Sequence, residues 1–208
     1  WYEWIILMNY INYSKPIQDL IECFKKIPGV GEKSAERMAL WAIDCDEDFI
    51  NTFADALIHG KTDIKRCSIC NNFSTNDICD ICQDKDRDES VICVVEKPKN
   101  VILFEKTGSF NGKYHVLDGL ISNGNYNNIN IEKLLKRLDD GNIKEIILAL
   151  EPNIDGEVTS LYISKLLESK NVKISKLAHG VPLGADMDYL DLLTLETALN
   201  DRKQINSK

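Results

Sequence analysis

Residues 67–82 read Cys-Ser-Ile-Cys-Asn-Asn-Phe-Ser-Thr-Asn-Asp-Ile-Cys-Asp-Ile-Cys, and this segment separates two parts of the chain that differ in pattern. It holds two C-x-x-C pairs, Cys67 with Cys70 and Cys79 with Cys82. Four thiolates with this spacing can surround one Zn²⁺ tetrahedrally, each at about 2.3 Å. Such a shell leaves no position for water, so we expect one structural Zn²⁺ per chain and no catalysis at the metal. Two disulfides or a redox-active pair are the alternatives.

The cellular compartment favours zinc over disulfides. No stretch of about 18 or more apolar residues suggests a membrane span, and residues 1–7 lack the basic leader of a secretory signal. We therefore expect a cytoplasmic protein, associated with the nucleoid when it is engaged with DNA, in which paired cysteines bind metal. Met8 has the character of a natural start, so residues 1–7 are interpreted as a non-native extension. Cys23, Cys45 and Cys93 lie in apolar-patterned segments and are expected to pack in the core.

The residues before the cysteine segment have the apolar spacing of helices. Three successive helices are predicted, and their inner faces are expected to carry Ile17, Leu20, Ile21, Phe24 and Ile27, then Ala35, Met38, Ala39 and Ala42, then Ile50, Phe53, Ala54, Leu57 and Ile58. Pro28 and Gly29 separate the first two helices, because proline disfavours helix before it and glycine tolerates positive φ. The pattern predicts a helical domain over residues 8–60 and a zinc knuckle over residues 61–88.

The residues after the knuckle alternate between short apolar runs and amphipathic segments. The runs at 91–95, 114–117, 145–150 and 172–178 are predicted strands, and the stretches between them include helices around 101–104, 131–138 and 157–167. This alternation predicts a parallel sheet with helices packed on its faces. The fold class is therefore α/β with several modules, the sheet domain covering 89–178 and a glycine-rich loop and helix covering 179–208.

The turn between the first two predicted helices is a candidate DNA-binding site. Backbone N–H groups at the start of the second helix can bind a phosphate, and nearby cations would add charge attraction. The residues that we expect to contact DNA are Lys25, Lys26, Gly29, Gly31, Lys33 and Arg37. A turn of this kind can also merely join two helices, and the formal net charge of −8 restricts any DNA contact to a local patch.

Acidic residues follow two of the predicted strands. Glu96 comes after 91–95, and Glu151, Asp155 and Glu157 follow 145–150. The carboxyl ends of parallel strands meet at one sheet edge, where these oxygens could hold Mg²⁺ or receive a basic partner protein. Acids at helix starts are also favoured by the helix dipole alone.

Taken together, these motifs resemble the RecR family of recombination mediators over almost the whole chain. Besides the four-cysteine knuckle, the segments that carry the resemblance are I-P-G-V-G-E-K-S-A-E-R-M-A at 27–39, V-V-E-K-P at 94–98, E-K-T-G at 105–108, Y-H-V-L at 114–117, G-E-V-T-S-L-Y-I at 156–163 and A-H-G-V-P-L-G at 178–184. The turn then corresponds to a helix-hairpin-helix motif.

The resemblance implies a Toprim domain at 89–178 and DNA contacts from Lys33 and Arg37. It also implies a homotetrameric ring and a mediator role in which RecO-type and RecF-type partners help to load RecA at gapped DNA, with no catalytic activity. Toprim enzymes have D-x-D at the positions of Glu151 and Asn153, so this chain has one acid of that pair. The rival hypotheses are a Mg²⁺-dependent Toprim enzyme acting on DNA, nuclease or primase-like, and an adaptor that makes no DNA contact.

Overall fold

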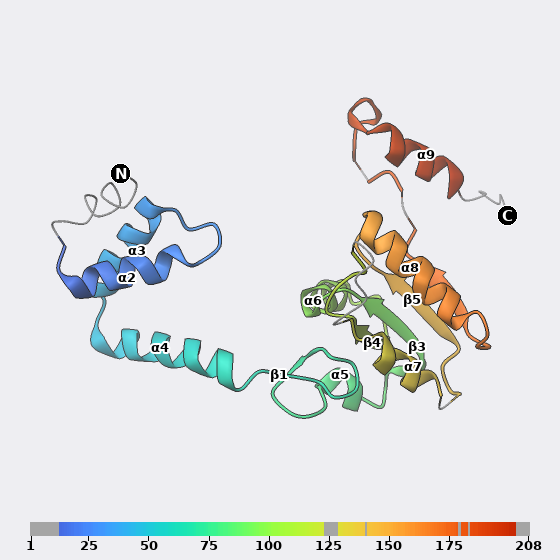
Figure 1. Cartoon of the computed structure of the whole chain (residues 1–208), viewed down its shortest axis with the longest axis horizontal. Helices are drawn as coiled ribbons and strands as arrows, with labels where there is room; N and C mark the ends of the chain where they lie inside the picture. The colour runs from blue at the N-terminus through green and yellow to red at the C-terminus, as the bar shows by residue number, and fades with distance from the viewer. Residues whose placement is uncertain (1–12, 123–128, 140, 179, 183, 203–208) are drawn as a thin grey trace. The chain divides into compact units, whose positions relative to one another are not determined.

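The computed structural model describes residues 13–122, 129–139, 141–178, 180–182 and 184–202 (Figure 1). The chain forms two compact units, residues 1–63 and 64–208. The prediction made for residues 1–7 lies outside the described residues, as do residues 179, 183 and 203–208 of the predicted loop and helix. Among the residues described, no helix combines the length and the apolar character needed to cross a membrane.

The first unit consists of the three predicted helices. They are α2 (Lys15–Lys25), α3 (Glu32–Asp44) and α4 (Glu47–Thr62). Ile21 of α2 packs against Ala35 and Ala39 of α3, and all three side chains are fully buried. Two alanines on one face of α3 allow α2 to approach closely. Asp46 caps α4 by accepting a hydrogen bond from the Phe49 backbone N–H at 2.8 Å.

The predicted inner faces were partly wrong. No residue of α4 is buried within the described chain, and Phe53 and Leu57 are 39% and 62% exposed. Met38 of α3 is also exposed, and so is Cys23 of α2, whereas Cys93 is buried in the sheet as expected. Apolar spacing establishes that a segment is helical, but burial also requires a facing surface. In the described chain α4 lacks such a surface.

The second unit begins with the cysteine segment. Its short elements are β1 (Lys65–Arg66), β2 (Phe73–Ser74) and α5 (Asp80–Gln83), with β1 and β2 antiparallel. The turn between the two strands contains Asn71 at φ 63°, in the left-handed region that asparagine tolerates. The Asn71 N–H donates to the Cys67 carbonyl at 2.9 Å, which closes the turn that holds the first cysteine pair.

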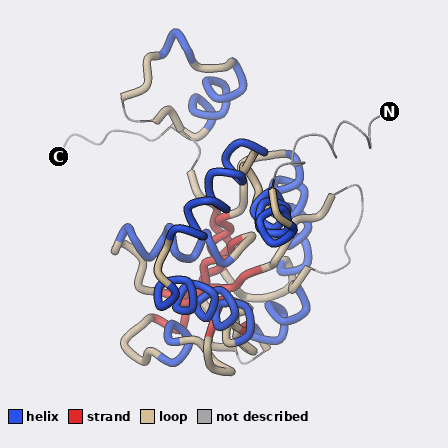
Figure 2. The backbone as a smooth tube through the Cα atoms, turned by 90° about the vertical axis from the view of Figure 1, so that its left-hand side faces the viewer, coloured by secondary structure: helices blue, strands red, loops and turns tan. Residues whose placement is uncertain are grey.

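The sheet that follows is parallel throughout, which confirms the predicted architecture. Its strands are β3 (Asp88–Val95), β4 (Gly112–Val116), β5 (Glu145–Ala149) and β6 (Lys173–Lys176), in the order β4-β3-β5-β6. The helices that connect them are α6 (Pro98–Thr107), α7 (Ile131–Leu138) and α8 (Ile154–Leu167). These strands are red in Figure 2. A 3-10 helix (Met187–Tyr189) and α9 (Leu192–Asn200) complete the unit.

The alternating side chains of β3 supply two separate cores. Ile92 and Val94 join the cluster that contains α7 and α8 residues, whereas Cys93 and Val95 join the cluster that contains Val101 of α6. Strands buried on both faces are expected to be continuous apolar runs, which is why these runs were recognisable in the sequence. This arrangement places the carboxyl ends of β3 and β5 beside one another, with Val95 opposite Ala149.

Candidate functional site

The four cysteines of the knuckle converge on one point. Their sulfur atoms all lie within 4.8 Å of one another, and the Cys70 and Cys79 sulfurs are 3.5 Å apart. Tetrahedral Zn²⁺ with Zn–S distances of about 2.3 Å requires sulfurs separated by about 3.8 Å, so the arrangement fits zinc. Cys67, Cys70 and Cys79 are buried and Cys82 is half-buried. None of the four cysteines forms a disulfide in the structure. This agrees with the zinc prediction and disagrees with the alternative of two disulfides.

The surroundings of the sulfurs favour a thiolate at Cys79 and raise the pKa of Cys70 and Cys82. The Cys79 backbone N–H donates to the Cys67 sulfur at 3.3 Å. Hydrogen bonds from Cys70 and Cys82 lower the pKa of Cys79 to about 2, while its hydrogen bond to Cys79 raises the pKa of Cys70. Deprotonated thiols are the form that binds metal. The knuckle holds a structural zinc with all four positions taken by sulfur.

The knuckle is attached to the edge strand of the sheet. The Val116 N–H donates to the Cys70 carbonyl at 2.8 Å, and the Asn71 side-chain amide donates to the Val116 carbonyl at 3.3 Å. Arg66 adds an ion pair with Asp118 at 2.9 Å. The zinc segment therefore extends the hydrogen bonding of β4 and forms part of the same compact unit as the sheet.

The turn between α2 and α3 has the geometry expected of a hairpin. Gly29 has φ +83°, a conformation that other residues rarely adopt, and the Val30 N–H donates to the Ile27 carbonyl at 3.0 Å. Gly31 is the N-cap of α3 with φ −81°, so its backbone does not require glycine. A Cβ at either glycine would meet no atom within 4 Å, so the surface above the turn is open. No side chain caps the first N–H groups of α3.

The predicted basic residues surround this hairpin. Lys33 and Arg37 lie four positions apart on α3, and both are exposed. Lys26 is the exposed C-cap of α2, whereas Lys25 forms an ion pair with Glu22 at 2.9 Å. The structure thus brings these cations close to the start of α3, where Gly31 provides no side-chain cap. Such a surface can bind phosphate without reading a base sequence.

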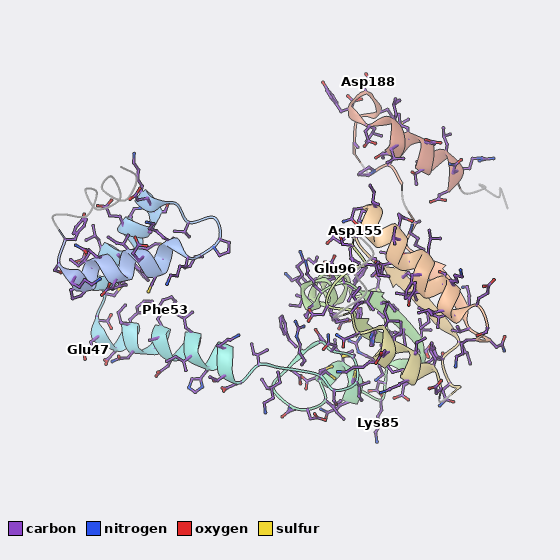
Figure 3. All side chains as sticks on the ribbon, in the orientation of Figure 1. Glu47, Phe53, Lys85, Glu96, Asp155 and Asp188 are labelled. Carbon is purple, nitrogen blue, oxygen red and sulfur yellow. The ribbon has the colours of Figure 1, made fainter. Side chains whose placement is uncertain are left out.

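The predicted acidic residues follow β3 and β5 at the carboxyl end of the sheet. Figure 3 labels Glu96, which follows β3, and Asp155, which lies in the first turn of α8 after β5. Glu96 is buried and pairs with Lys97 at 2.9 Å, and Glu157 pairs with Lys176. Among the residues that the structure describes, the cysteine cluster is the one group of three or more His, Cys, Asp or Glu side chains close enough to share a metal ion.

The loop after β5 also differs from a Toprim enzyme site in its use of Asn153. The Asn153 side chain is the N-cap of α8 and accepts a hydrogen bond from the Gly156 N–H at 2.9 Å. This cap explains why α8 begins at Ile154, earlier than the predicted 157. The side chain at the position of the second enzymatic carboxylate is therefore occupied in holding the helix.

Sequence reasoning missed three residues that the structure makes prominent. Gly156 is required by space, because a Cβ there would lie 1.9 Å from the Glu151 carbonyl oxygen. Lys113 is a nearly buried cation within a strand, and Arg137 belongs to the predicted helix 131–138 but turns toward the knuckle. A charged residue inside the otherwise buried run G-K-Y-H-V was the available signal for Lys113.

Four sequence models of protein families match consecutive parts of the chain. A model described as RecR, helix-hairpin-helix matches residues 17–60, and one for the four-cysteine zinc finger domain of RecR matches residues 64–84. A Toprim domain model matches residues 90–178, and one described as RecR, C-terminal matches residues 180–203. The matches cover the hairpin, the zinc knuckle, the parallel sheet and α9 in that order.

Proposed function

Because the chain belongs to the RecR family, whose domains indicate DNA binding and a role in recombinational repair, we propose that it is a non-catalytic scaffold that grips DNA through the α2–α3 hairpin and brings partner proteins to gapped DNA. The partners in this proposal are RecO-type and RecF-type proteins, and the outcome is the loading of RecA. This role would place the protein in the cytoplasm, on nucleoid DNA while it is engaged.

One observation carries the DNA-binding part of the proposal. The hairpin presents open glycine backbone at Gly29 and Gly31 and the N-terminus of α3 beside the exposed side chains of Lys33 and Arg37. Phosphate binds favourably at a helix N-terminus, and lysine and arginine release counterions when they contact phosphates. Because these contacts are to the DNA backbone, binding should be insensitive to base sequence.

The test is DNA binding by Lys33→Ala combined with Arg37→Ala, measured at several salt concentrations on gapped and duplex DNA. If two phosphate contacts are lost, affinity should fall on all sequences and the slope of log K against log salt should flatten by roughly 1–2. The control is Lys15→Ala with Lys61→Ala, which removes the same charge from the same unit at exposed positions on α2 and α4. A hairpin variant that binds like wild type at matched salt would refute the assignment.

We also propose that several chains act together, as a ring-shaped homotetramer. A single hairpin on an acidic chain offers few phosphate contacts, and linked copies raise the effective concentration of each hairpin at the DNA. The uncovered apolar face of α4, which includes Phe53 and Leu57, supports self-association, because exposed apolar patches mark interfaces. Light scattering that finds a monomer while DNA binding is intact would contradict this proposal.

The acidic edge is proposed to receive a basic partner protein. Glu151 and Asp155 are half-exposed at the carboxyl end of the sheet, where opposite charge on a partner would speed and orient docking. We expect Glu151→Gln or Asp155→Asn to weaken a complex with a RecO-type protein and to leave DNA binding nearly unchanged, measured by titration of each binding reaction. Equal effects on both reactions would argue against a separate partner surface.

The competing candidate is a Mg²⁺-dependent Toprim enzyme. It would use Glu96, Glu151 and Asp155, but Glu96 is paired with Lys97 and Asn153 is held as a helix cap. Hydrolysis or transfer at a phosphodiester also needs a nucleophile or general base placed beside the metal. Cleavage or primer synthesis in Mg²⁺ or Mn²⁺ that disappears in Glu96→Gln would contradict the scaffold proposal and support the enzyme hypothesis.

A further inference from the structure

Two cations of the sheet unit lie against the zinc knuckle. The first is Lys113 of the edge strand β4, which is only 4% exposed. Its Nζ donates to the carbonyl oxygens of Ile81 at 3.0 Å, Cys82 at 3.2 Å and Asp84. These three bonds use all the donors of an ammonium group. A buried lysine is therefore fixed on the turn that carries the fourth zinc ligand.

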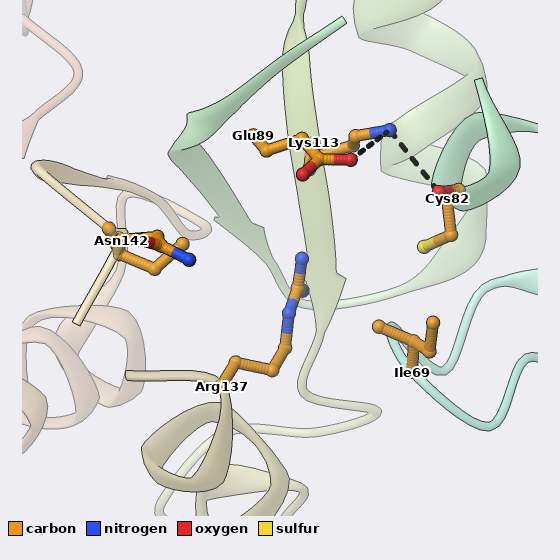
Figure 4. Close-up of a pocket in the computed structure, with 7 residues that line it drawn as sticks. Ile69, Cys82, Glu89, Lys113, Arg137 and Asn142 are labelled. Atoms are coloured by element: carbon orange, nitrogen blue, oxygen red, sulfur yellow. Dashed lines mark hydrogen bonds and ion pairs between the residues drawn. The ribbon is translucent and has the colours of Figure 1, made fainter. Parts of the chain in front are cut away.

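The second cation is Arg137 at the end of α7. Its Nη1 donates to the Tyr114 carbonyl at 2.6 Å, and the side chain lines a cavity of about 200 Å³ together with Lys113, Cys82 and Ile69 (Figure 4). Burial lowers the pKa of Arg137. The guanidinium thus lines the same cavity as the fourth zinc ligand.

Nearby positive charge stabilises a zinc–tetrathiolate centre because the centre itself is negatively charged. Four thiolates and one Zn²⁺ carry a net charge of −2, and here three of the sulfurs are buried. A buried charge is costly unless opposite charge or hydrogen bonds compensate for it. Lys113 and Arg137 supply two positive charges. The Glu89 carboxylate lies 3.9 Å from Lys113, but its side chain is 72% exposed, so water screens its contribution.

We propose that Lys113 and Arg137 neutralise the zinc–thiolate centre, so that zinc occupancy and the fastening of β4 and α7 to the knuckle stabilise one another. With zinc bound, the cations face a dianion. Without zinc that dianion is absent, and the screened Glu89 carboxylate is the opposing charge that remains near Lys113. The two residues are positioning residues for the metal site, and the zinc in turn secures the sheet edge.

A purely structural role for Arg137 makes a different prediction. If the guanidinium only packs in the cavity and holds the Tyr114 carbonyl, its removal should cost the same stability with and without zinc. If it balances charge, removal should destabilise the zinc-bound protein and should leave the zinc-free protein equally stable or more stable. Comparison of the two forms separates these roles.

The experiment measures zinc affinity of the full-length protein by competition with a chromophoric chelator. Arg137→Met is expected to lower the affinity by roughly 10–100-fold, the range usual for residues that support metal ligands, and Lys113→Met should act in the same direction. Arg137→Lys, which keeps the charge but loses the planar fork, should retain most of the affinity. Urea unfolding of wild type and Arg137→Met, each with zinc and after chelation, completes the comparison.

The matched control is Arg66→Met. Arg66 also fastens the knuckle, through the Asn71 carbonyl at 3.3 Å, but its charge is already paired with the Asp118 carboxylate at 2.9 Å. Its loss should therefore weaken zinc binding less than the loss of Arg137. Unchanged zinc affinity in Arg137→Met would overturn the proposal, as would an Arg137→Lys variant as impaired as Arg137→Met. If chelation unfolds the unit, the affinities alone decide the question.

Discussion

Replacement of Gly156 by alanine tests how closely α8 must approach the loop after β5. Gly156 lies in the first turn of α8, and an added Cβ would sit 1.9 Å from the Glu151 carbonyl oxygen and 3.1 Å from its carbonyl carbon. Ordinary carbon–oxygen contacts are about 3.3–3.6 Å, so one of the two backbones must move by more than about 1 Å. The obstacle is backbone, which cannot rotate away as a side chain can.

The backbone movement in Gly156→Ala lowers the free energy of unfolding. Inserting a methyl group into a well-packed site costs about 1–3 kcal/mol, and the upper part of that range applies here because the helix cap is disturbed as well. For a unit of this size, each kcal/mol corresponds to a shift of roughly 2–4 °C in Tm. We therefore expect Gly156→Ala to lower the Tm of the sheet unit by about 5–10 °C.

The same substitution at Gly60 is the matched control. Gly60 lies inside α4, and an added Cβ there would meet no atom within 4 Å. Alanine stabilises an exposed helix interior by about 0.5–1 kcal/mol relative to glycine, so Gly60→Ala should be neutral to stabilising. Circular dichroism during thermal and urea unfolding, with zinc content checked, gives both values. A Gly156→Ala protein within about 0.5 kcal/mol of wild type would refute the reasoning from close approach.

Two further predictions concern the interior of the sheet unit. Cys67→Ser leaves three thiolates for the metal, so elemental analysis should find well under one zinc per chain and proteolysis should cut within residues 64–84; full zinc content would contradict the ligand assignment. His115 is fully buried, and burial lowers its pKa to about 4 from the ordinary 6.5. As the pH falls from 6.5 to 4 the unfolded chain takes up this proton first, so the free energy of unfolding should decrease by about 3 kcal/mol over that window. His115→Phe should show a shallower decrease in urea unfolding between about pH 7 and pH 4.5, and equal slopes would show that another group is responsible.

The sequence predicted those features that depend on local pattern or on spacing. The strands β3 and β5 are buried on both faces over most of their length and therefore appear as apolar runs, and the zinc ligands lie close together in the chain. The start of α8 at Ile154 was missed because it depends on a polar cap, Asn153, and not on apolar spacing. The exposure of Phe53 on α4 was missed because periodicity does not reveal whether a partner surface exists. Lys113 and Arg137 were missed because their neighbours are distant in sequence.

A local basic patch reconciles an acidic chain with DNA binding. The formal net charge is −8, yet Lys33 and Arg37 lie close together in α3. Charges separated by more than about 10 Å are largely screened at ordinary salt, so distant acids need not cancel a local basic patch. Under the proposed function, two phosphate contacts per chain would give weak and salt-sensitive binding, which several chains acting together would multiply. Weak binding by each hairpin would also let DNA exchange between copies, as the proposed transfer of DNA to other proteins requires.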